Sequence, residues 1–259
     1  MREQGLDAAI RAAGGIGALA RRIGISQPSV SNWSRIPAER VLSVEDATGV
    51  DREILRPDLY GRQPGERGEV EDVEAARAQE YALLSVLLAR APDAALLARL
   101  AQLRSDASPL GLAHGALGEA ARCAGVERIE REFFDLFIGL GRGELLPYGS
   151  YYLTGFLHER PLARLRAHLS RLGIERSEGH AEPEDHAAIL CEIMAGIISG
   201  RFSVPAGADR ELFGQHLAPW IGRFFADLEG AGAAGFYRRI GTLGRVFVEI
   251  ETEAFALPS

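Results

Sequence analysis

The sequence contains almost no pattern that favours a β-strand. Nowhere in its 259 residues do Val, Ile, Thr and aromatic residues alternate with polar residues over six or more positions between turn-forming clusters. Apolar residues instead recur with helical spacing, in segments that Gly and Pro separate. We therefore expect an all-α protein in which a small helix-turn-helix bundle precedes a larger helical bundle.

The first sixty residues differ from the rest of the chain in helix length and in charge. Residues 1–61 hold short helical segments and carry 8 Arg and 8 acidic residues. Residues 62–259 hold longer segments and carry 21 Arg against 28 acidic residues, which accounts for the whole net charge of -7. Residues 62–73 are rich in Gly and acidic residues and predict a linker. We predict domains at residues 1–61 and 74–259.

The composition and the apolar runs bear on where such a chain resides. A content of 47% hydrophobic and 25% charged residues is typical of soluble globular proteins. The longest run without a charged residue, Leu145–His158, has 14 residues, whereas a helix that spans a bilayer needs ~20. The N-terminus carries Glu3 and Asp7 and lacks the apolar core of a signal peptide. We expect a cytoplasmic protein without membrane insertion.

One segment of the first domain has the spacing of two helices that cross through a short turn. Such a crossing needs a small residue where the helices touch, a flexible residue in the turn and an apolar residue on the second helix. Ala20, Gly24 and Val30 supply these residues in order. Ser26 is placed to cap the second helix, and Pro28 falls in its first turn, where proline is tolerated. The spacing therefore predicts a helix-turn-helix.

The outward face of this second helix presents short polar side chains of the kinds that reach base edges in the major groove. The segment resembles the helix-turn-helix of the Cro and YdaS-like repressor class, over residues 5–61. The resemblance implies DNA binding, with arginines on the phosphates and with a dimer needed for useful affinity. A purely structural or protein-binding hairpin is the alternative. The candidate DNA-binding residues are Arg21, Arg22, Gln27, Ser29, Ser31, Asn32 and Arg35.

Three segments of the second domain mix aromatic, turn-forming and charged residues. The first runs from Phe133 to Gly139 and continues into the aromatic loop 146–152. The second, at 179–186, contains Glu-Pro-Glu-Asp-His and opens an apolar helix, and the third, at 213–225, contains Phe213, Trp220 and the aromatic pair Phe224–Phe225. Aromatic residues in loops are costly to expose, so they pack inward or line a groove for an apolar ligand.

In this order, the three segments resemble the TorD/DmsD family of cytoplasmic redox-enzyme maturation chaperones, over residues 74–254. The matching patterns are L-F-x-G followed by P-Y-x-S-x-Y, then E-P-x-D-H, then F-x-x-H-x-x-P-W. The resemblance implies a TorD-like bundle that binds the twin-arginine leader and the apo form of a molybdenum-cofactor oxidoreductase subunit, of the formate dehydrogenase or dimethyl-sulfoxide-reductase type. It also implies a peptide-binding region of Phe133, Leu136, Phe137, Pro147, Tyr148 and Ser150, with Glu182, Asp185 and His186 on its rim.

The acidic motif has more than one explanation. A receptor for two guanidinium groups and an apolar stretch needs carboxylates beside an apolar groove, which this domain offers. In a purely structural alternative, Pro183 lies in the first turn of a helix, and Glu184 and Asp185 favour the positive end of that helix. A metal site formed by Glu182, Asp185 and His186 is a third explanation. No second ligand cluster has helical spacing, so we expect no metal and no cofactor.

The remaining motifs do not indicate an enzyme. No Ser-His-Asp order, phosphate-binding Gly loop or dinucleotide fingerprint occurs. We expect the apolar stripe from Ile189 to Ile197 in the core and His216 as a packing residue. The leading hypothesis is a chaperone with an attached DNA-binding domain, and the alternative is a transcription regulator whose second domain senses a small molecule. A homodimer is left open. The histidines expected on the surface or in loops are His114, His158, His168 and His180.

Overall fold

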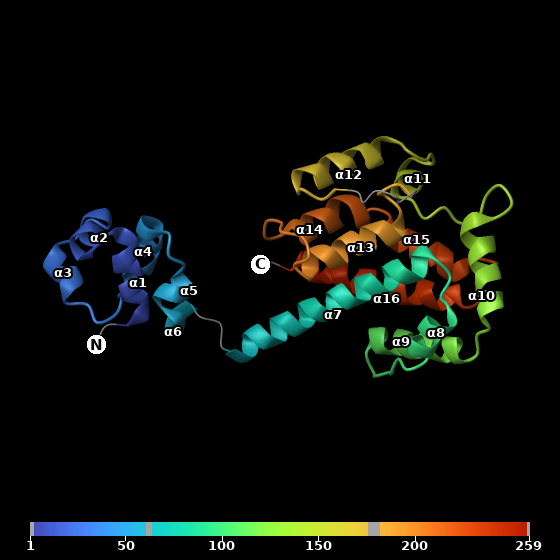
Figure 1. The fold of residues 1–259 in the computed structure, drawn as a ribbon, viewed down its shortest axis with the longest axis horizontal. Coiled ribbons are helices and arrows are strands. Elements are labelled where there is room, and N and C mark those ends of the chain that lie inside the picture. Colours follow the sequence, from blue (N-terminus) through green and yellow to red (C-terminus); the bar gives the residue numbers. More distant parts are fainter. Residues whose placement is uncertain (1–2, 61–63, 176–181, 258–259) are drawn as a thin grey trace. The chain divides into compact units, whose positions relative to one another are not determined.

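The computed structural model describes residues 3–60, 64–175 and 182–257 (Figure 1). The chain forms two compact units, Met1–Asp72 and Val73–Ser259. The described ranges contain α-helices and short 3-10 and π-helical turns but no β-strand. This confirms the predicted all-α class. In the same ranges, no helix is both long enough and apolar enough to cross a membrane.

The smaller unit is a bundle of short helices around an apolar core. Ala20 and Val30 are buried where two of these helices meet, and Gly24 between them has a φ of 70°. The Ser26 hydroxyl accepts a hydrogen bond from the backbone N–H of Ser29 at 3.3 Å, which confirms the predicted cap. In the described part of this unit the helices are α1 (Gln4–Ala13), α2 (Ile16–Arg22), α3 (Gln27–Ser31), α4 (Val41–Thr48), α5 (Arg52–Leu55) and α6 (Pro57–Tyr60), with a 3-10 turn at Ala38–Arg40.

Two long helices run antiparallel in the larger unit, namely α7 (Pro64–Ala89) from Val73 onward and α16 (Tyr237–Ala256). The ring of Tyr81 meets that of Phe247 edge-on at 4.7 Å, and the Tyr237 hydroxyl donates a hydrogen bond to the Leu87 carbonyl at 3.1 Å. Because α7 begins at Pro64, much of the predicted linker is helical.

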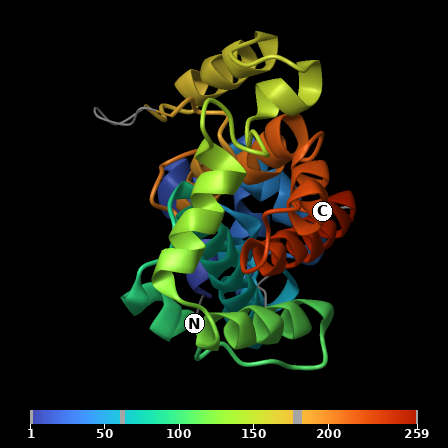
Figure 2. The ribbon, with the colours of Figure 1, turned by 90° about the vertical axis from the view of Figure 1, so that its right-hand side faces the viewer.

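Helix α15 (Ile221–Gly230) packs closely against α16 in the core of the larger unit. A Cβ atom at Gly244 would lie only 2.2 Å from the ring of Phe225, so only glycine permits this approach. Figures 1 and 2 show α11 and α12 at one end of this unit and α8 and α9 at the other. Its other described helices are α8 (Ala94–Leu100), α9 (Pro109–Arg122), α10 (Val126–Phe133), α11 (Gly149–Thr154), α12 (Arg160–Arg171), α13 (Ala187–Ile198) and α14 (Ala208–Leu212), with π-helical turns at Phe134–Ile138 and Phe213–Leu217.

The acidic motif lies outside a helix. Helix α13 begins at Ala187 with His186 as its N-cap, so the predicted place of Pro183 in the first helical turn is wrong, whereas Glu184 and Asp185 do lie next to the N-terminal end of this helix. The residues before His186 are held in a loop by contacts with the segment that leads into α11.

Candidate functional site

Backbone hydrogen bonds join the aromatic loop before α11 to the acidic motif before α13. The Gly149 N–H donates to the Asp185 carbonyl at 2.9 Å, and the Ala187 N–H donates to the Pro147 carbonyl at 2.8 Å. These bonds form an isolated antiparallel bridge between Tyr148 and His186. The structure thus brings together two motifs that lie more than thirty residues apart in the sequence.

Asp185 lies buried at the centre of this junction. One oxygen of its carboxylate, Oδ2, accepts a hydrogen bond from the Ser150 N–H at 2.7 Å. The other oxygen, Oδ1, and the Ser150 hydroxyl are both buried and have no hydrogen-bond partner in the part of the chain that the structure describes. A buried polar group without a partner costs ~1–3 kcal/mol. The junction therefore holds an unused acceptor and an unused hydroxyl.

His186 caps helix α13 with its side chain. The ring Nδ1 accepts a hydrogen bond from the Ala188 N–H at 3.1 Å, which requires a neutral ring with its proton on Nε2. Burial lowers the pKa of His186 to about 4, so this form persists at neutral pH. The ring also meets that of Tyr148 edge-on at 5.0 Å. Tyr148 in turn donates its hydroxyl proton to the exposed Glu182 carboxylate, and burial followed by this bond raises the pKa of Tyr148.

The three predicted residues of the first motif lie in a separate cluster. The rings of Phe133 and Phe137 are half-buried and pack on the buried Tyr237 of α16, at 5.7 Å and 5.5 Å. Leu136 is fully buried, so it supports this cluster from inside. The Leu145 N–H donates to the Leu136 carbonyl at 2.8 Å, which links the cluster to the start of the aromatic loop. The predicted peptide-binding residues therefore form two groups.

A carboxylate that the sequence did not single out fixes the aromatic cluster. Glu132 is buried and accepts hydrogen bonds from three successive backbone N–H groups, those of Gly235, Phe236 and Tyr237, at 2.7, 3.1 and 2.6 Å. These donors lie at the start of α16, where the helix dipole favours an anion. Because Glu132 resembles any helical surface glutamate in sequence, only the fold discloses this role.

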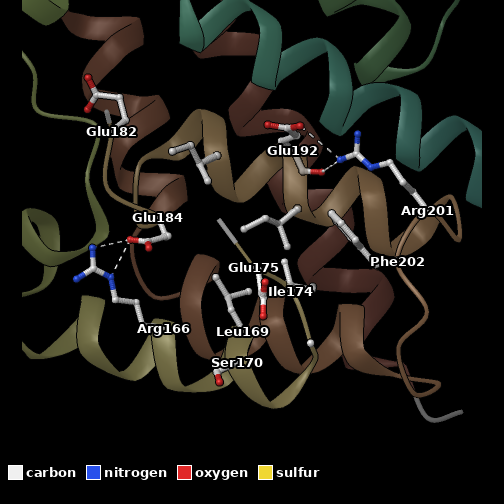
Figure 3. A pocket seen from close by; sticks show the side chains of 13 residues that line it. Arg166, Leu169, Ser170, Ile174, Glu175, Glu182, Glu184, Glu192, Arg201 and Phe202 are labelled. Atoms are coloured by element: carbon white, nitrogen blue, oxygen red, sulfur yellow. Dashed lines mark hydrogen bonds and ion pairs between the residues drawn. The ribbon is translucent and has the colours of Figure 1, made fainter. Parts of the chain in front are cut away.

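A cavity of about 430 Å³ lies between α12 and α13 (Figure 3), and we call it the α12–α13 cavity. Its walls combine apolar side chains with four glutamates, of which only Glu182 was among the predicted residues. Nothing in the sequence indicates this cavity, because the spacing of Ile189 and Ile193 predicts that both residues lie in the core. Ile193 is indeed buried, but Ile189 is half-buried, and both line the cavity.

A second cavity, of about 600 Å³, lies on the other side of the acidic motif, and we call it the Asp185 cavity. Besides Asp185, it is lined by Arg164, Arg171 and His216. His216 Nε2 lies 3.0 Å from Nδ1 of His168. Burial, more than the neighbouring charges, lowers the pKa of both rings, that of His216 to about 4.

The structure corrects part of the histidine assignment. His168 is buried at 2% exposure, so its expected surface position is wrong. His114 is half-buried and lies 2.9 Å from a carboxylate oxygen of Glu80, and this contact raises the pKa of His114. His158 is exposed in a loop, as predicted, and His180 lies outside the described residues. In the ranges that the structure covers, no three His, Cys, Asp or Glu side chains converge on a point that could hold a metal ion.

All seven predicted DNA-binding side chains are exposed on the smaller unit. Three of them already have partners: Ser29 bonds the Ser26 hydroxyl at 2.7 Å, Arg22 donates to the Ala47 carbonyl at 3.1 Å, and Arg35 lies 3.6 Å from Asp58. The remaining four make no side-chain hydrogen bond to another described residue. They are Arg21, Gln27, Ser31 and Asn32.

Comparisons with known proteins match the two units to different families. Residues 103–226 match the family model described as nitrate reductase delta subunit, and residues 6–64 match that described as bacterial toxin YdaS. The chaperone protein TorD of Vibrio cholerae serotype O1 is 30% identical over 127 residues, which are 46% of this chain and 58% of that protein. The TorD protein of Aliivibrio fischeri is 25% identical over 138 residues, 49% of this chain and 64% of that protein.

Both alignments cover less than two thirds of the length of those relatives. Among solved structures, a candidate redox enzyme maturation protein from Archaeoglobus fulgidus superposes with a TM-score of 0.45 and 19% identity, over 67% of this chain and 93% of that one.

Proposed function

We propose that this chain, which joins a segment related to the TorD chaperones to a segment related to the YdaS family, is a cytoplasmic chaperone for a molybdenum-cofactor oxidoreductase subunit. In this proposal the larger unit binds the twin-arginine leader and the apo form of the subunit, of formate dehydrogenase or dimethyl-sulfoxide-reductase type. The smaller unit binds DNA and gives the chaperone a regulatory role. The protein is not an enzyme.

The observation that carries the proposal is the junction of Tyr148, Asp185 and His186. It unites two of the motifs on which the resemblance to the TorD/DmsD family rests, and its buried carboxylate oxygen has no hydrogen-bond partner among the described residues. An incoming peptide N–H or guanidinium group is the kind of donor that such an oxygen accepts, and a hydrogen bond to a charged group contributes ~1.5–3 kcal/mol. The half-buried ring of Tyr148, which packs edge-on against His186, offers apolar contact beside it.

The test uses a synthetic leader peptide that carries two adjacent arginines followed by an apolar stretch, titrated into the full chain by calorimetry. Asp185→Asn keeps an acceptor for the Ser150 N–H but removes the charge, and we expect it to weaken binding about tenfold. Glu253→Gln, which changes an exposed carboxylate on α16, serves as the matched control. The proposal fails if the wild-type chain does not bind the peptide, or if Asp185→Asn binds as tightly as Glu253→Gln.

A transcription regulator that senses a small molecule is the second candidate, and the Asp185 cavity is the observation that favours it. Its volume of about 600 Å³ lies within the ~300–1,000 Å³ of small-molecule sites. This candidate predicts that a small ligand, and not the leader peptide, raises the melting temperature and changes affinity for an operator. A combined regulator, in which leader binding changes DNA affinity, predicts that the peptide itself alters operator binding.

A further inference from the structure

We propose that the α12–α13 cavity is a second peptide subsite, which accepts arginine side chains flanked by apolar residues, and that Arg201 occupies it until such a peptide displaces it. This inference rests on the proposed function, because the twin-arginine leader is its occupant. It assigns the arginines of that peptide to residues other than the Tyr148–Asp185–His186 junction.

The floor of the cavity is apolar and already formed. Leu169 of α12 and Ile174, which follows that helix, line one side of it (Figure 3). Ile189 and Ile193 of α13 also line the cavity. Phe202 closes the cavity from the loop that follows α13. Apolar side chains that converge on a hollow of about 430 Å³ fit the aliphatic stems of arginine and the apolar residues beside them.

The charges around this floor complement two guanidinium groups. Glu184 and Glu192 each have a resident arginine, Arg166 and Arg201 respectively, so these pairs are formally neutral. Neither Glu175 nor Glu182 has an arginine or histidine within ion-pair distance among the described residues. Among the described residues, two formal negative charges therefore remain beside the apolar floor, as many as the positive charges of a twin-arginine segment.

The carboxylates are also arranged for an extended cation rather than a metal ion. In the described ranges they do not form a group of three ligands that could hold a metal. Glu182 and Glu184 lie on the segment before α13, whereas Glu192 lies on α13 itself, so the charges are spread along the cavity (Figure 3). Such spacing suits separate side chains of one peptide.

The two resident ion pairs differ in how easily they open. Both the Nε and a terminal nitrogen of Arg166 lie 2.8 Å from one carboxylate oxygen of Glu184, whose side chain is only 14% exposed. Arg201 lies 3.5 Å from the Glu192 carboxylate, and both side chains are more than half exposed. Exposed pairs of this kind contribute little to stability. Arg201 therefore leaves its carboxylate at small cost, whereas Arg166 stays in place.

Arg201 is already a mimic of the bound state. Its guanidinium group donates a hydrogen bond to the Glu192 carbonyl at 3.2 Å and lies over the ring of Phe202 at 5.0 Å from the centroid. A carboxylate, a carbonyl and an aromatic face are a favourable environment for a guanidinium group. An arginine from a peptide that enters the cavity would take the same three partners.

Calorimetric titrations with two peptides test this assignment on the full chain. One peptide carries two adjacent arginines before an apolar stretch, and the other has both arginines replaced by alanine. We expect Arg201→Ala to bind the arginine peptide about threefold more tightly, because a competitor is removed, and Glu192→Gln to bind it about fivefold more weakly. Neither variant should change affinity for the alanine peptide.

The controls separate this inference from the proposed function. Glu253→Gln should leave both affinities unchanged, and Arg201→Gln repeats the test in a longer side chain if Arg201→Ala lowers the melting temperature. One outcome is that the wild-type chain binds the arginine peptide while Glu192→Gln and Arg201→Ala leave the ratio of affinities for the arginine and alanine peptides unchanged. In that case the subsite is overturned and the chaperone proposal stands. If the wild-type chain binds neither peptide, both are overturned.

Discussion

The two units expose their candidate residues in opposite ways. In the smaller unit, the predicted residues come from one continuous segment, and all of their side chains lie at the surface. In the larger unit, the predicted residues come from distant segments, and most are buried or half-buried. A short motif specifies a surface when local helix geometry is sufficient, whereas a site built from long-range contacts depends on buried supporting residues that no motif reveals.

The largest expected effect is on such a support. Glu132→Ala removes a buried carboxylate and leaves the N–H groups of Gly235, Phe236 and Tyr237 without their acceptor. A buried unsatisfied donor costs ~1–3 kcal/mol, so we expect the larger unit to lose about 3 kcal/mol or more of its free energy of unfolding. Chemical denaturation would measure the loss. Glu130→Ala, an exposed change on the same helix, should have little effect, and equal losses in both variants would refute the role of Glu132.

Histidine titration should also distinguish the units. All six histidines lie beyond residue 72, and the pKa of the buried His186 is lowered to about 4. A histidine whose folded pKa is lowered contributes stability above its unfolded pKa of ~6.5 and loses this contribution as the pH falls toward the folded value. Acidification from about pH 7.5 to about pH 5.5 should therefore cost about 1 kcal/mol through His186 alone.

The matched variant for this titration is His186→Asn. Asparagine is a favourable N-cap and retains an acceptor for the Ala188 N–H, but it does not titrate. Its free energy of unfolding should fall less between the two pH values than that of the wild-type chain. Equal slopes would show that His186 does not carry the pH dependence.

The sequence predicted the smaller unit in more detail than the larger one, because its site comes from one continuous segment. Ala20, Gly24, Ser26 and Val30 could be assigned because a helix-turn-helix imposes each residue type at a fixed spacing along one segment. The all-α class followed from periodicity in the same way. In the larger unit, the pairing of the Pro147–Tyr148 loop with the acidic motif required a resemblance, since no local rule joins segments so far apart.

Other features of the larger unit could not be derived from any local pattern. The π-helical turn after α10 aims Leu136 inward, which periodicity alone does not fix. The pair of His168 and His216 joins α12 to the segment before α15, and the burial of His168 could not be recognised from its neighbours in sequence. The burial of His168 is a property of packing between helices, which is decided by long-range contacts.

A smaller effect is expected from the cap that begins the second helix of the motif. Ser26→Ala removes the hydroxyl that accepts the Ser29 N–H, and loss of an N-cap costs ~0.5–2 kcal/mol. Because α3 is short, the loss should appear as reduced stability of the smaller unit. Ser34→Ala, an exposed serine outside a helix, is the control. Denaturation followed by the fluorescence of Trp33, in a Trp220→Phe background that removes the signal of the larger unit, would report on this unit. Identical midpoints for Ser26→Ala and Ser34→Ala would exclude the cap.

The smallest expected effect concerns the phosphate contacts of the smaller unit. Arg21 is exposed and makes no side-chain hydrogen bond or ion pair with a described residue, whereas Arg35 already lies 3.6 Å from Asp58. If Arg21 contacts a phosphate, Arg21→Ala should weaken binding to any duplex and reduce the slope of log affinity against log salt by about 1. Asn32→Ala should leave that slope unchanged and relax sequence preference instead, because an asparagine contact reads a base edge. Mobility-shift titrations at several salt concentrations separate the two results. Equal slopes for Arg21→Ala and the wild-type chain would place Arg21 away from the DNA and would leave the predicted surface open to a protein partner.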